Sequence, residues 1–378
     1  MLFSQIPGLA GIKKQLIDSV KRNHVAHAQL FAGKEGSANL AMALAFTNYL
    51  NCENPGEEDA CGICASCQKN QKFIHPDVNF IFPTSATTKF KREDATSDKF
   101  LVEWREFLKK SVYGNVADWA QEFGWENKQL IIPKQESRNI VKALSLKAFE
   151  GAYKVMIVWL PETMNVNAAN GILKILEEPP ERTIFILVSN APNLLLTTIT
   201  SRTQQVNVPS FSDDDIFKVT KSLPENVTTD ERASQIAYMA EGNMRLALEL
   251  AHEVNNDTDE FFKNWMRQCF TYNFAELVQL AEEFQKRGKS FQKELLDASS
   301  KTLRETLIST QAVDALNRVP ESEKGFIEKF GTVFSSDKIM KVAPQISEAY
   351  YHIERNANPK ILFLDLSLGI AKVARAKA

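Results

Sequence analysis

The 378-residue sequence lacks three features that would narrow its function at once. It has no uninterrupted apolar run long enough to cross a bilayer, so we expect no membrane-spanning segment. Its start, MLFSQIPGLAGIKKQL, does not join a basic stretch to an apolar one, so no secretory signal is expected and the predicted location is cytoplasmic. The net charge is −2, so any contact with nucleic acid must depend on a local basic patch or on partners.

The order of apolar segments predicts an α/β fold followed by helices. Apolar residues make up 44% of the chain, enough for real cores, and the length favours two or three domains. Strand-like and helix-like segments alternate up to residue 208, which predicts a mostly parallel sheet covered on both faces. The predicted strands are 28–32, 78–82, 154–159, 183–188 and 204–208, with helices at 37–50, 136–149 and 165–178 between them. Only helices are predicted after Pro209.

Residues 84–128 form an insertion that starts polar and then becomes rich in aromatic residues, with three tryptophans. One interpretation is that the insertion folds back onto its own domain. The other is a docking surface, because exposed aromatic side chains mark interfaces.

Four of the five cysteines are clustered in a C-x8-C-x2-C-x2-C pattern: Cys52, Cys61, Cys64 and Cys67. Four thiolates complete a tetrahedral Zn²⁺ shell and leave no position for water, so we predict one structural zinc ion. An iron–sulfur cluster uses the same ligands and stays open as an alternative, as do four unrelated structural cysteines. The fifth, Cys269, is predicted to be a buried helix residue.

The stretch LFAGKEGSANLAMALAF looks like a phosphate-binding loop without its working residues. Counted from Gly33, the pattern G-x-x-x-x-G-K-[ST] requires Gly, Lys and Ser or Thr where Ala38, Asn39 and Leu40 stand. Gly33 and Gly36 can still shape the turn. Asn39 supplies no charge for a phosphate, and Leu40 supplies no oxygen for Mg²⁺.

The end of a second predicted strand also lacks the residues that a nucleotide site needs. Hydrolysis also needs carboxylates at the end of a second buried strand, where KVMIVWLPE has Trp159 and Leu160. Both halves of a nucleotide site are therefore missing together, and no ATP is expected in this chain.

The segment KVMIVWLPETMNVNAANGILKILEEPPERTIFILVSN, the stretch LLLTTITSRTQQV and the four cysteines resemble the clamp-loader branch of the AAA+ ATPases. The similarity covers most of residues 1–250 and is greatest to the delta-prime family of bacterial DNA polymerase III. It implies a RecA-like AAA+ domain over 1–208, with a zinc loop at 52–67, then a helical lid over 209–252 and a helical collar over 253–378. The ATP-binding members have an Asp-Glu pair where Trp159 and Leu160 stand.

The resemblance also implies roles for two arginines. The family's Ser-Arg-Cys motif matches Ser201, Arg202 and Thr203, so Arg202 would be an arginine finger that acts on a neighbouring subunit's ATP, with Ser201 as its motif partner. The family's sensor-two arginine matches Arg245, which we expect to be structural because no nucleotide is expected. A proline that is usual in the family is Thr197 here.

The implied function is that of a stator without catalysis of its own, in the complex that loads the sliding clamp onto primed DNA during replication. The implied partners are the clamp-loader ATPase subunits, a delta subunit, the sliding clamp and primer-template DNA. The main alternative is an active AAA+ ATPase or nucleic-acid motor with an atypical loop. A free-standing zinc module that binds nucleic acid is a second alternative, which the lack of an evident basic patch disfavours.

Overall fold

The computed structural model describes residues 1–378 except 127, 146, 225–228, 253–256, 311–320 and 377–378. The chain folds into two compact units, Met1–His252 and Glu253–Ala378. In the described part of the chain, no helix has both the length and the apolar character needed to span a membrane.

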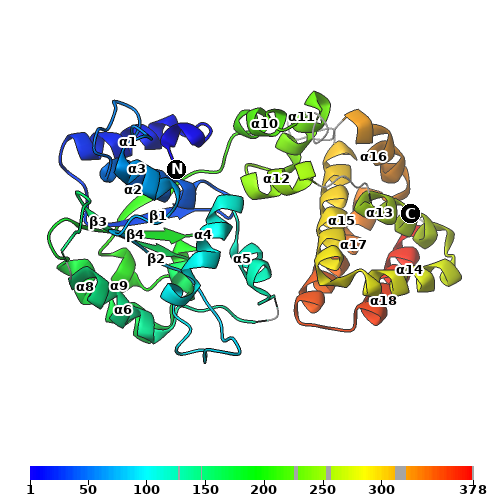
Figure 1. Cartoon of the computed structure of the whole chain (residues 1–378). Helices are drawn as coiled ribbons and strands as arrows, with labels where there is room; N and C mark the ends of the chain where they lie inside the picture. The colour runs from blue at the N-terminus through cyan, green and yellow to red at the C-terminus, as the bar shows by residue number, and fades with distance from the viewer. Residues whose placement is uncertain (127, 146, 225–228, 253–256, 311–320, 377–378) are drawn as a thin grey trace. The chain divides into compact units, whose positions relative to one another are not determined.

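A five-stranded parallel sheet forms the centre of the first unit (Figure 1). The strand order is β2-β3-β4-β1-β5, and every pairing is parallel. The strands are β1 (Ala28–Gly33), β2 (Val78–Ile81), β3 (Lys154–Trp159), β4 (Thr183–Ser189) and β5 (Gln204–Val208). These strands lie where the sequence predicts them, because nearly continuous apolar runs are typical of strands that are buried on both faces.

Successive side chains of the strands point to opposite faces and enter two separate cores. In β3, Val155, Ile157 and Trp159 belong to the core on one face. Met156 and Val158 belong to the core on the other. The first face is covered by α1 (Ala10–Lys21), α2 (Asn39–Leu50) and α3 (Ala65–Gln71), and the second by α6 (Lys134–Ser145), α7 (Val166–Gly171), α8 (Leu173–Glu177) and α9 (Thr197–Thr200) (Figure 1).

The helix predicted over 165–178 is wrong in one respect, because the structure divides it into α7 and α8. The break follows Gly171. A Cβ atom on this residue would lie 2.6 Å from the Oγ of Ser137 on α6, so only glycine permits the close approach of the two helices.

The insertion contributes α4 (Leu101–Lys110) and α5 (Val116–Phe123), which follow a short 3₁₀ helix at Ser97–Phe100. Three helices close the first unit: α10 (Asp213–Lys221), α11 (Asp230–Met239) and α12 (Met244–His252). Their apolar residues, among them Ile216, Ile236 and Met244, belong to the same core as α2 and the insertion.

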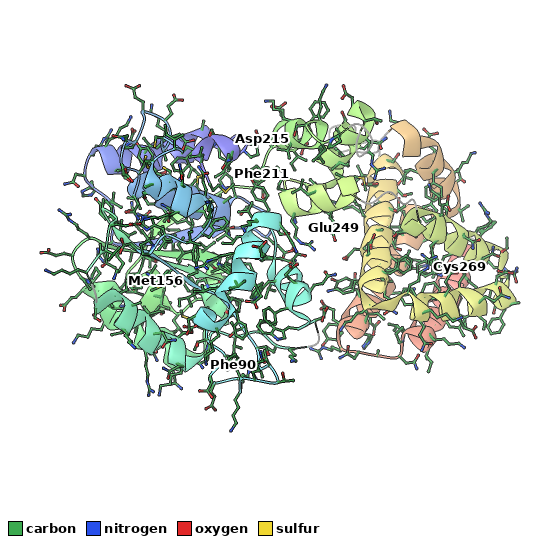
Figure 2. All side chains as sticks on the ribbon, viewed as in Figure 1. Phe90, Met156, Phe211, Asp215, Glu249 and Cys269 are labelled. Carbon is green, nitrogen blue, oxygen red and sulfur yellow. The ribbon has the colours of Figure 1, made fainter. Side chains whose placement is uncertain are left out.

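The second unit is helical throughout its described residues. Its helices are α13 (Asp257–Thr271), α14 (Phe274–Lys286), α15 (Gly288–Thr310), α16 (Glu321–Val333), α17 (Ser336–Glu354) and α18 (Pro359–Arg375). Cys269 is completely buried on α13, as predicted, and burial raises the pKa of its thiol to about 12 (Figure 2). The predicted fold class, a parallel α/β domain followed by helices, is confirmed.

Candidate functional site

The loop that follows β1 lies where parallel α/β sheets bind their ligands. β1 ends at Gly33 and α2 begins at Asn39, so residues 34–38 lie at the carboxyl edge of the sheet, the edge at which the parallel strands end. Ligands of such sheets bind outside this edge, where the N–H groups of a helix N-terminus can hold phosphate. The predicted loop therefore has the position of a nucleotide site.

Both glycines of the loop are required by its shape. A Cβ atom on Gly33 would lie 2.2 Å from the Oγ of Ser37. Gly36 has a φ of +73°, and a Cβ atom there would lie 1.8 Å from the Oδ1 of Asn243. The carbonyl oxygen of Gly36 also accepts a hydrogen bond from the main-chain N–H of Met244 at 3.0 Å. The start of α12 is therefore in direct contact with the loop.

Asn39 stands where a phosphate-binding lysine would be and makes a different set of contacts. Its Nδ2 donates to the carbonyl oxygen of Ser189 at 3.2 Å and to the Oδ1 of Asn190 at 2.8 Å. Its Oδ1 accepts from the N–H of Leu40 at 2.8 Å. Ala38 and Leu40 are buried. The amide thus ties the start of α2 to the end of β4.

Apolar side chains also occupy the end of β3. Trp159 is buried, and its ring lies 5.0 Å from that of Trp104 and 5.7 Å from that of Phe107, measured between centroids. Leu160 is buried in the left-handed region, with a φ of +53°, and its N–H donates to the carbonyl oxygen of Val188 at 2.8 Å. Neither side chain offers an oxygen ligand for Mg²⁺.

Glu162 is a residue that the sequence analysis missed. Its Oε1 accepts hydrogen bonds from the main-chain N–H groups of Asn190 at 3.0 Å and Ala191 at 3.2 Å. This carboxylate therefore fixes the turn after β4. The sequence shows an acidic residue at this position, after Leu160 and Pro161. Its role could not be predicted, because its hydrogen-bond partners lie 28 and 29 positions further along the chain.

The insertion folds back onto the carboxyl edge. Trp104, Trp119 and Trp125 are at most 2% exposed, so the docking-surface interpretation is wrong for the tryptophans. The Nε1 of Trp119 donates to the carbonyl oxygen of Pro83, just beyond β2, at 2.8 Å. The insertion begins where β2 ends, so its helices lie at the same edge as the loop.

Arg245 on α12 is held by the insertion. Its Nε and Nη2 donate to the two carboxylate oxygens of Asp118 on α5, at 2.6 and 2.8 Å, and Glu249 lies 3.1 Å from its Nη1. Hydrogen bonding to Asp118 raises the pKa of the guanidinium. Next to this pair, the Nδ2 of Asn115 donates to the Oε1 of Glu35 in the loop at 2.7 Å. The sequence analysis missed Asp118 and Asn115.

Arg202 lies at the opposite, amino edge of the sheet, two residues before β5 begins. Its guanidinium forms an ion pair with Glu177 on α8 and donates to the carbonyl oxygen of Thr198 at 2.9 Å. The side chain is 34% exposed. Ser201 is exposed and Thr203 is half-buried. In the free chain, Arg202 is therefore accessible but paired within its own subunit.

The four clustered cysteines are brought together after α2. Their Sγ atoms all lie within 4.8 Å of one another, and those of Cys61 and Cys67 are 3.9 Å apart. A tetrahedral zinc with Zn–S bonds of about 2.3 Å places its sulfurs about 3.8 Å apart. The donor set therefore fits a four-thiolate metal site such as one for zinc.

Main-chain N–H groups point at the sulfurs of this cluster. Those of Cys61, Cys64 and Cys67 donate to the Sγ atoms of Cys52, Cys61 and Cys64 at 3.2 to 3.4 Å. Bonds from the N–H groups of Ile63 and Cys64 lower the pKa of Cys61 to about 6, whereas burial raises the pKa of Cys52 and of Cys67. Such N–H donors stabilise the thiolate, which is the form that binds metal.

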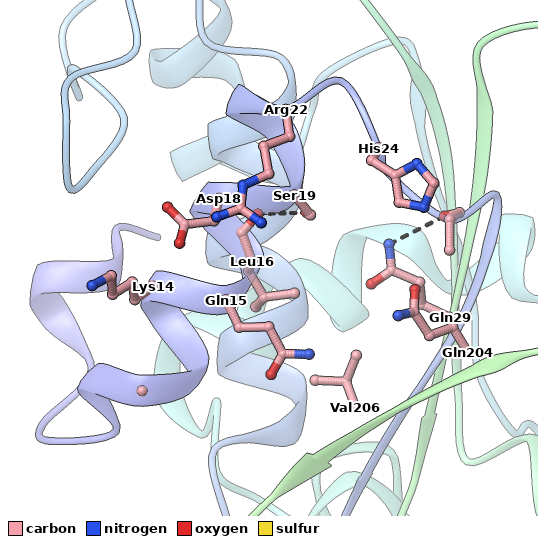
Figure 3. Close-up of a pocket in the computed structure, with 12 residues that line it drawn as sticks. Lys14, Gln15, Leu16, Asp18, Ser19, Arg22, His24, Gln29, Gln204 and Val206 are labelled. Carbon is pink, nitrogen blue, oxygen red and sulfur yellow. Dashed lines mark hydrogen bonds between the residues drawn. The ribbon is translucent and has the colours of Figure 1, made fainter.

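A cavity of about 510 Å³ lies at the amino edge, between α1 and the starts of β1 and β5 (Figure 3). Its lining includes Lys14, Gln15, Arg22, Gln29 and Gln204. The Nε2 of Gln29 donates to the carbonyl oxygen of Ala26 at 3.1 Å. None of the predicted site residues lines this cavity.

Comparison with curated proteins finds clamp-loader subunits. The DNA polymerase III subunit delta' of Bacillus subtilis is 26% identical over 193 residues, which are 51% of this chain and 45% of the relative. The subunit delta' of Pseudomonas aeruginosa is 32% identical over 184 residues, 49% of this chain and 43% of the relative. The subunit tau of Bacillus subtilis is 26% identical over 264 residues, 69% of this chain and 39% of the relative. The chain thus spans less than half the length of each of these relatives.

Among solved structures, a gamma subunit-related protein of DNA polymerase III from Thermotoga maritima aligns with a TM-score of 0.40 and 16% identity, over 95% of this chain and 100% of the other. The DNA clamp loader delta protein of Bacillus subtilis aligns with a TM-score of 0.32 and 10% identity, over 96% of this chain and 100% of the other.

A family model described as "DNA polymerase III, delta subunit" matches residues 9–212. This stretch is more than half of the chain, it contains the sheet, the cysteine cluster and Arg202, and the delta' relatives agree with the resemblance predicted from the sequence. The chain therefore belongs to the DNA polymerase III delta-subunit family of clamp-loader proteins.

Proposed function

We propose that this chain is a clamp-loader subunit that does not hydrolyse ATP and that lends Arg202 to the ATPase site of a neighbouring subunit. The observation that carries this proposal is the contrast between two places on one sheet. At the carboxyl edge, Asn39, Leu40 and Trp159 leave neither a cation for phosphate nor an oxygen for Mg²⁺. At the amino edge, Arg202 keeps its charge on an accessible loop.

Arg202 must change partners to act in this way. In the free subunit its guanidinium pairs with Glu177, which is 46% exposed. Exposed ion pairs contribute little stability, so a triphosphate with several negative charges can replace one carboxylate. The arginine would then stabilise the charge that develops on the transferred phosphoryl group.

Cys52, Cys61, Cys64 and Cys67 would hold one Zn²⁺. A closed zinc site of four thiolates acts as a structural staple, which here would fix residues 52–67. The sulfur ligands of Cys64 and Cys67 are presented by the start of α3, because Cys64 is its N-cap and its Sγ accepts from the N–H of Cys67. An iron–sulfur cluster remains the alternative occupant of the same four thiolates.

The partners of such a subunit would be clamp-loader ATPase subunits and a delta subunit, with the sliding clamp and primer-template DNA bound by the assembly. The net charge of −2 supports a chain that is held by protein–protein contacts and meets DNA only within the complex. This role implies a cytoplasmic location and a subunit of the DNA polymerase III holoenzyme, rather than an enzyme by itself.

The test is an Arg202→Ala chain assembled with the ATPase subunits. We expect ATP turnover at the adjacent site, stimulated by clamp and primed DNA, to fall by about 10³-fold or more, as for other arginine fingers. Arg138→Ala, an exposed arginine on α6, is the matched control and should leave this turnover unchanged. Normal turnover with Arg202→Ala would remove the proposed role of this arginine.

Direct titration of the isolated chain with ATP and Mg²⁺ separates the stator from its main alternative. We expect no binding heat at micromolar ATP. Tight binding that requires Mg²⁺ would favour an active AAA+ ATPase with an atypical loop.

A further inference from the structure

We propose that the insertion is a built-in occupant of the nucleotide position, in which Asp118 supplies the anion that holds Arg245. The inference rests on the proposed function and deepens it, because it adds to the shared core a polar contact between α12 and the insertion that needs no nucleotide. The residues Ala38, Asn39 and Leu40 do not by themselves require the insertion to cover the loop. The cover is therefore an observation separate from the composition of the loop.

The nucleotide position has three walls, and the insertion contacts each of them. Asn115 donates to Glu35 on the loop at 2.7 Å. Trp104 and Phe107 lie against Trp159 at the end of β3. Asp118 binds Arg245 at the start of α12. The insertion therefore contacts all three elements that border the N-terminus of α2.

The aromatic part of this cover is continuous with the protein core. Trp104 stacks on Phe82 at 4.3 Å and meets Trp119 edge to face at 5.4 Å. Both tryptophans are completely buried, and they belong to the same core as Leu40 and Met244. Large aromatic side chains bury 150–250 Å² each, roughly, so the cover is part of the folded core and not a loosely attached lid.

Contacts within the insertion hold the Asp118 carboxylate in place, independently of Arg245. Its Oδ2 accepts from the main-chain N–H of Asn115 at 2.9 Å, and Asn115 in turn caps α5 by accepting from the N–H groups of Ala117 and Asp118. The carboxylate is therefore fixed at the first turn of α5. It then binds the guanidinium with two parallel hydrogen bonds, the geometry in which arginine also binds phosphate.

The charges around Arg245 also disfavour a polyphosphate. The carboxylates of Asp118, Glu249 and Glu35 all act on this one guanidinium. Asp118 and Arg245 are only 24% and 23% exposed, so water screens their charges incompletely. A triphosphate at this place would meet three negative side chains and an arginine that is already paired.

The experiment uses the full-length chain and measures amide hydrogen exchange by mass spectrometry. The variant Arg245→Gln removes the charge and leaves the cap of α5 intact. We expect exchange in α12 and in residues 34–38 to become faster by on the order of tenfold, because the variant removes the bidentate charged pair and leaves the contact of Met244 with Gly36 as the link between α12 and the loop. Asp118→Asn should have a similar effect, and the double variant should add little to either single one.

Glu122→Gln on the same helix is the matched control. Glu122 pairs with Lys110 inside the insertion, so this variant should leave exchange in α12 unchanged. Unchanged exchange in Arg245→Gln would overturn the proposal, and so would full additivity of the two single variants.

A second arm tests the occupancy itself with ATP and Mg²⁺ as the probe. We expect no protection of residues 34–38 in the natural chain. Protection by ATP would show that a nucleotide can enter beside the insertion and would also overturn the proposal. The exchange measurement does not depend on Arg202. Normal ATP turnover with Arg202→Ala together with faster exchange in Arg245→Gln would contradict only the arginine finger. Lost turnover with Arg202→Ala together with unchanged exchange in Arg245→Gln would contradict only the present proposal.

Discussion

The two edges of the sheet in Met1–His252 differ in what covers them. The carboxyl edge is covered by the insertion, where Trp104 and Trp119 are completely buried and Asp118 binds Arg245. The amino edge carries the cysteine loop, the 510 Å³ cavity and Arg202, and of the four clustered cysteines Cys67 is buried while the others are half-buried. The difference teaches that Arg245 at the carboxyl edge is paired with the insertion, whereas Arg202 at the amino edge is 34% exposed and can be reached by another molecule.

The largest expected effect comes from opening the carboxyl edge. Trp104→Ala should leave a cavity beside Trp159 and Trp119 and lower the free energy of unfolding by about 3–5 kcal/mol, as other large aromatic deletions do. Urea unfolding measures this loss. Val102→Ala, on the same helix but 68% exposed, is the control and should change stability little. A loss below 1 kcal/mol, roughly, would mean that the cover is not part of the core.

Metal removal tests the amino edge. We expect freshly purified protein to contain one zinc per chain, and Cys64→Ser or a strong chelator to remove it and lower the melting temperature by roughly 4–8 °C. Cys269→Ala lies outside the cluster and should keep the metal. Equal amounts of iron and sulfide with visible absorption would indicate the iron–sulfur alternative. A metal-free chain with unchanged melting would contradict the site.

The smallest expected effect comes from Glu177, which pairs with Arg202 at the amino edge. Glu177→Gln should change the free energy of unfolding by less than about 1 kcal/mol, because both side chains are substantially exposed. In the assembled complex we expect turnover to be kept or slightly raised, since Arg202 is released. A loss of turnover would show that Glu177 has a role of its own, and Lys174→Ala on the same helix is a control for general damage to α8.

Much of the fold could be predicted because its signals are local. The strands are apolar runs, and α10 begins with a Ser-Asp cap that the structure shows as a capping box at Ser212. The division of α7 from α8 was missed because the apolar residues of 165–178 keep a helical period across it, and the close approach of Gly171 to Ser137 on α6 joins residues that are far apart in the sequence.

At the carboxyl edge, the sequence could predict only which nucleotide-binding residue types are absent. The losses at Asn39 and Trp159 are visible in the sequence, because a known pattern states which residue types belong there. The contacts that the insertion makes at this edge cannot be read from the sequence. Asp118 and Arg245 are 127 positions apart, and no local pattern joins an insertion helix to α12. Arg202 was predicted from a motif, but its ion pair with Glu177 depends on the fold.

The burial of α2 has a consequence for how this protein can change over evolutionary time. Every residue of the helix from Asn39 to Leu50 is buried. A single substitution of Asn39 by lysine would place an unpaired charge beside the end of β4, at a position that is 5% exposed, and would be strongly destabilising. Introducing a lysine and a hydroxyl here would therefore require changes at several covered positions together. Packing therefore constrains substitution at every position of this helix.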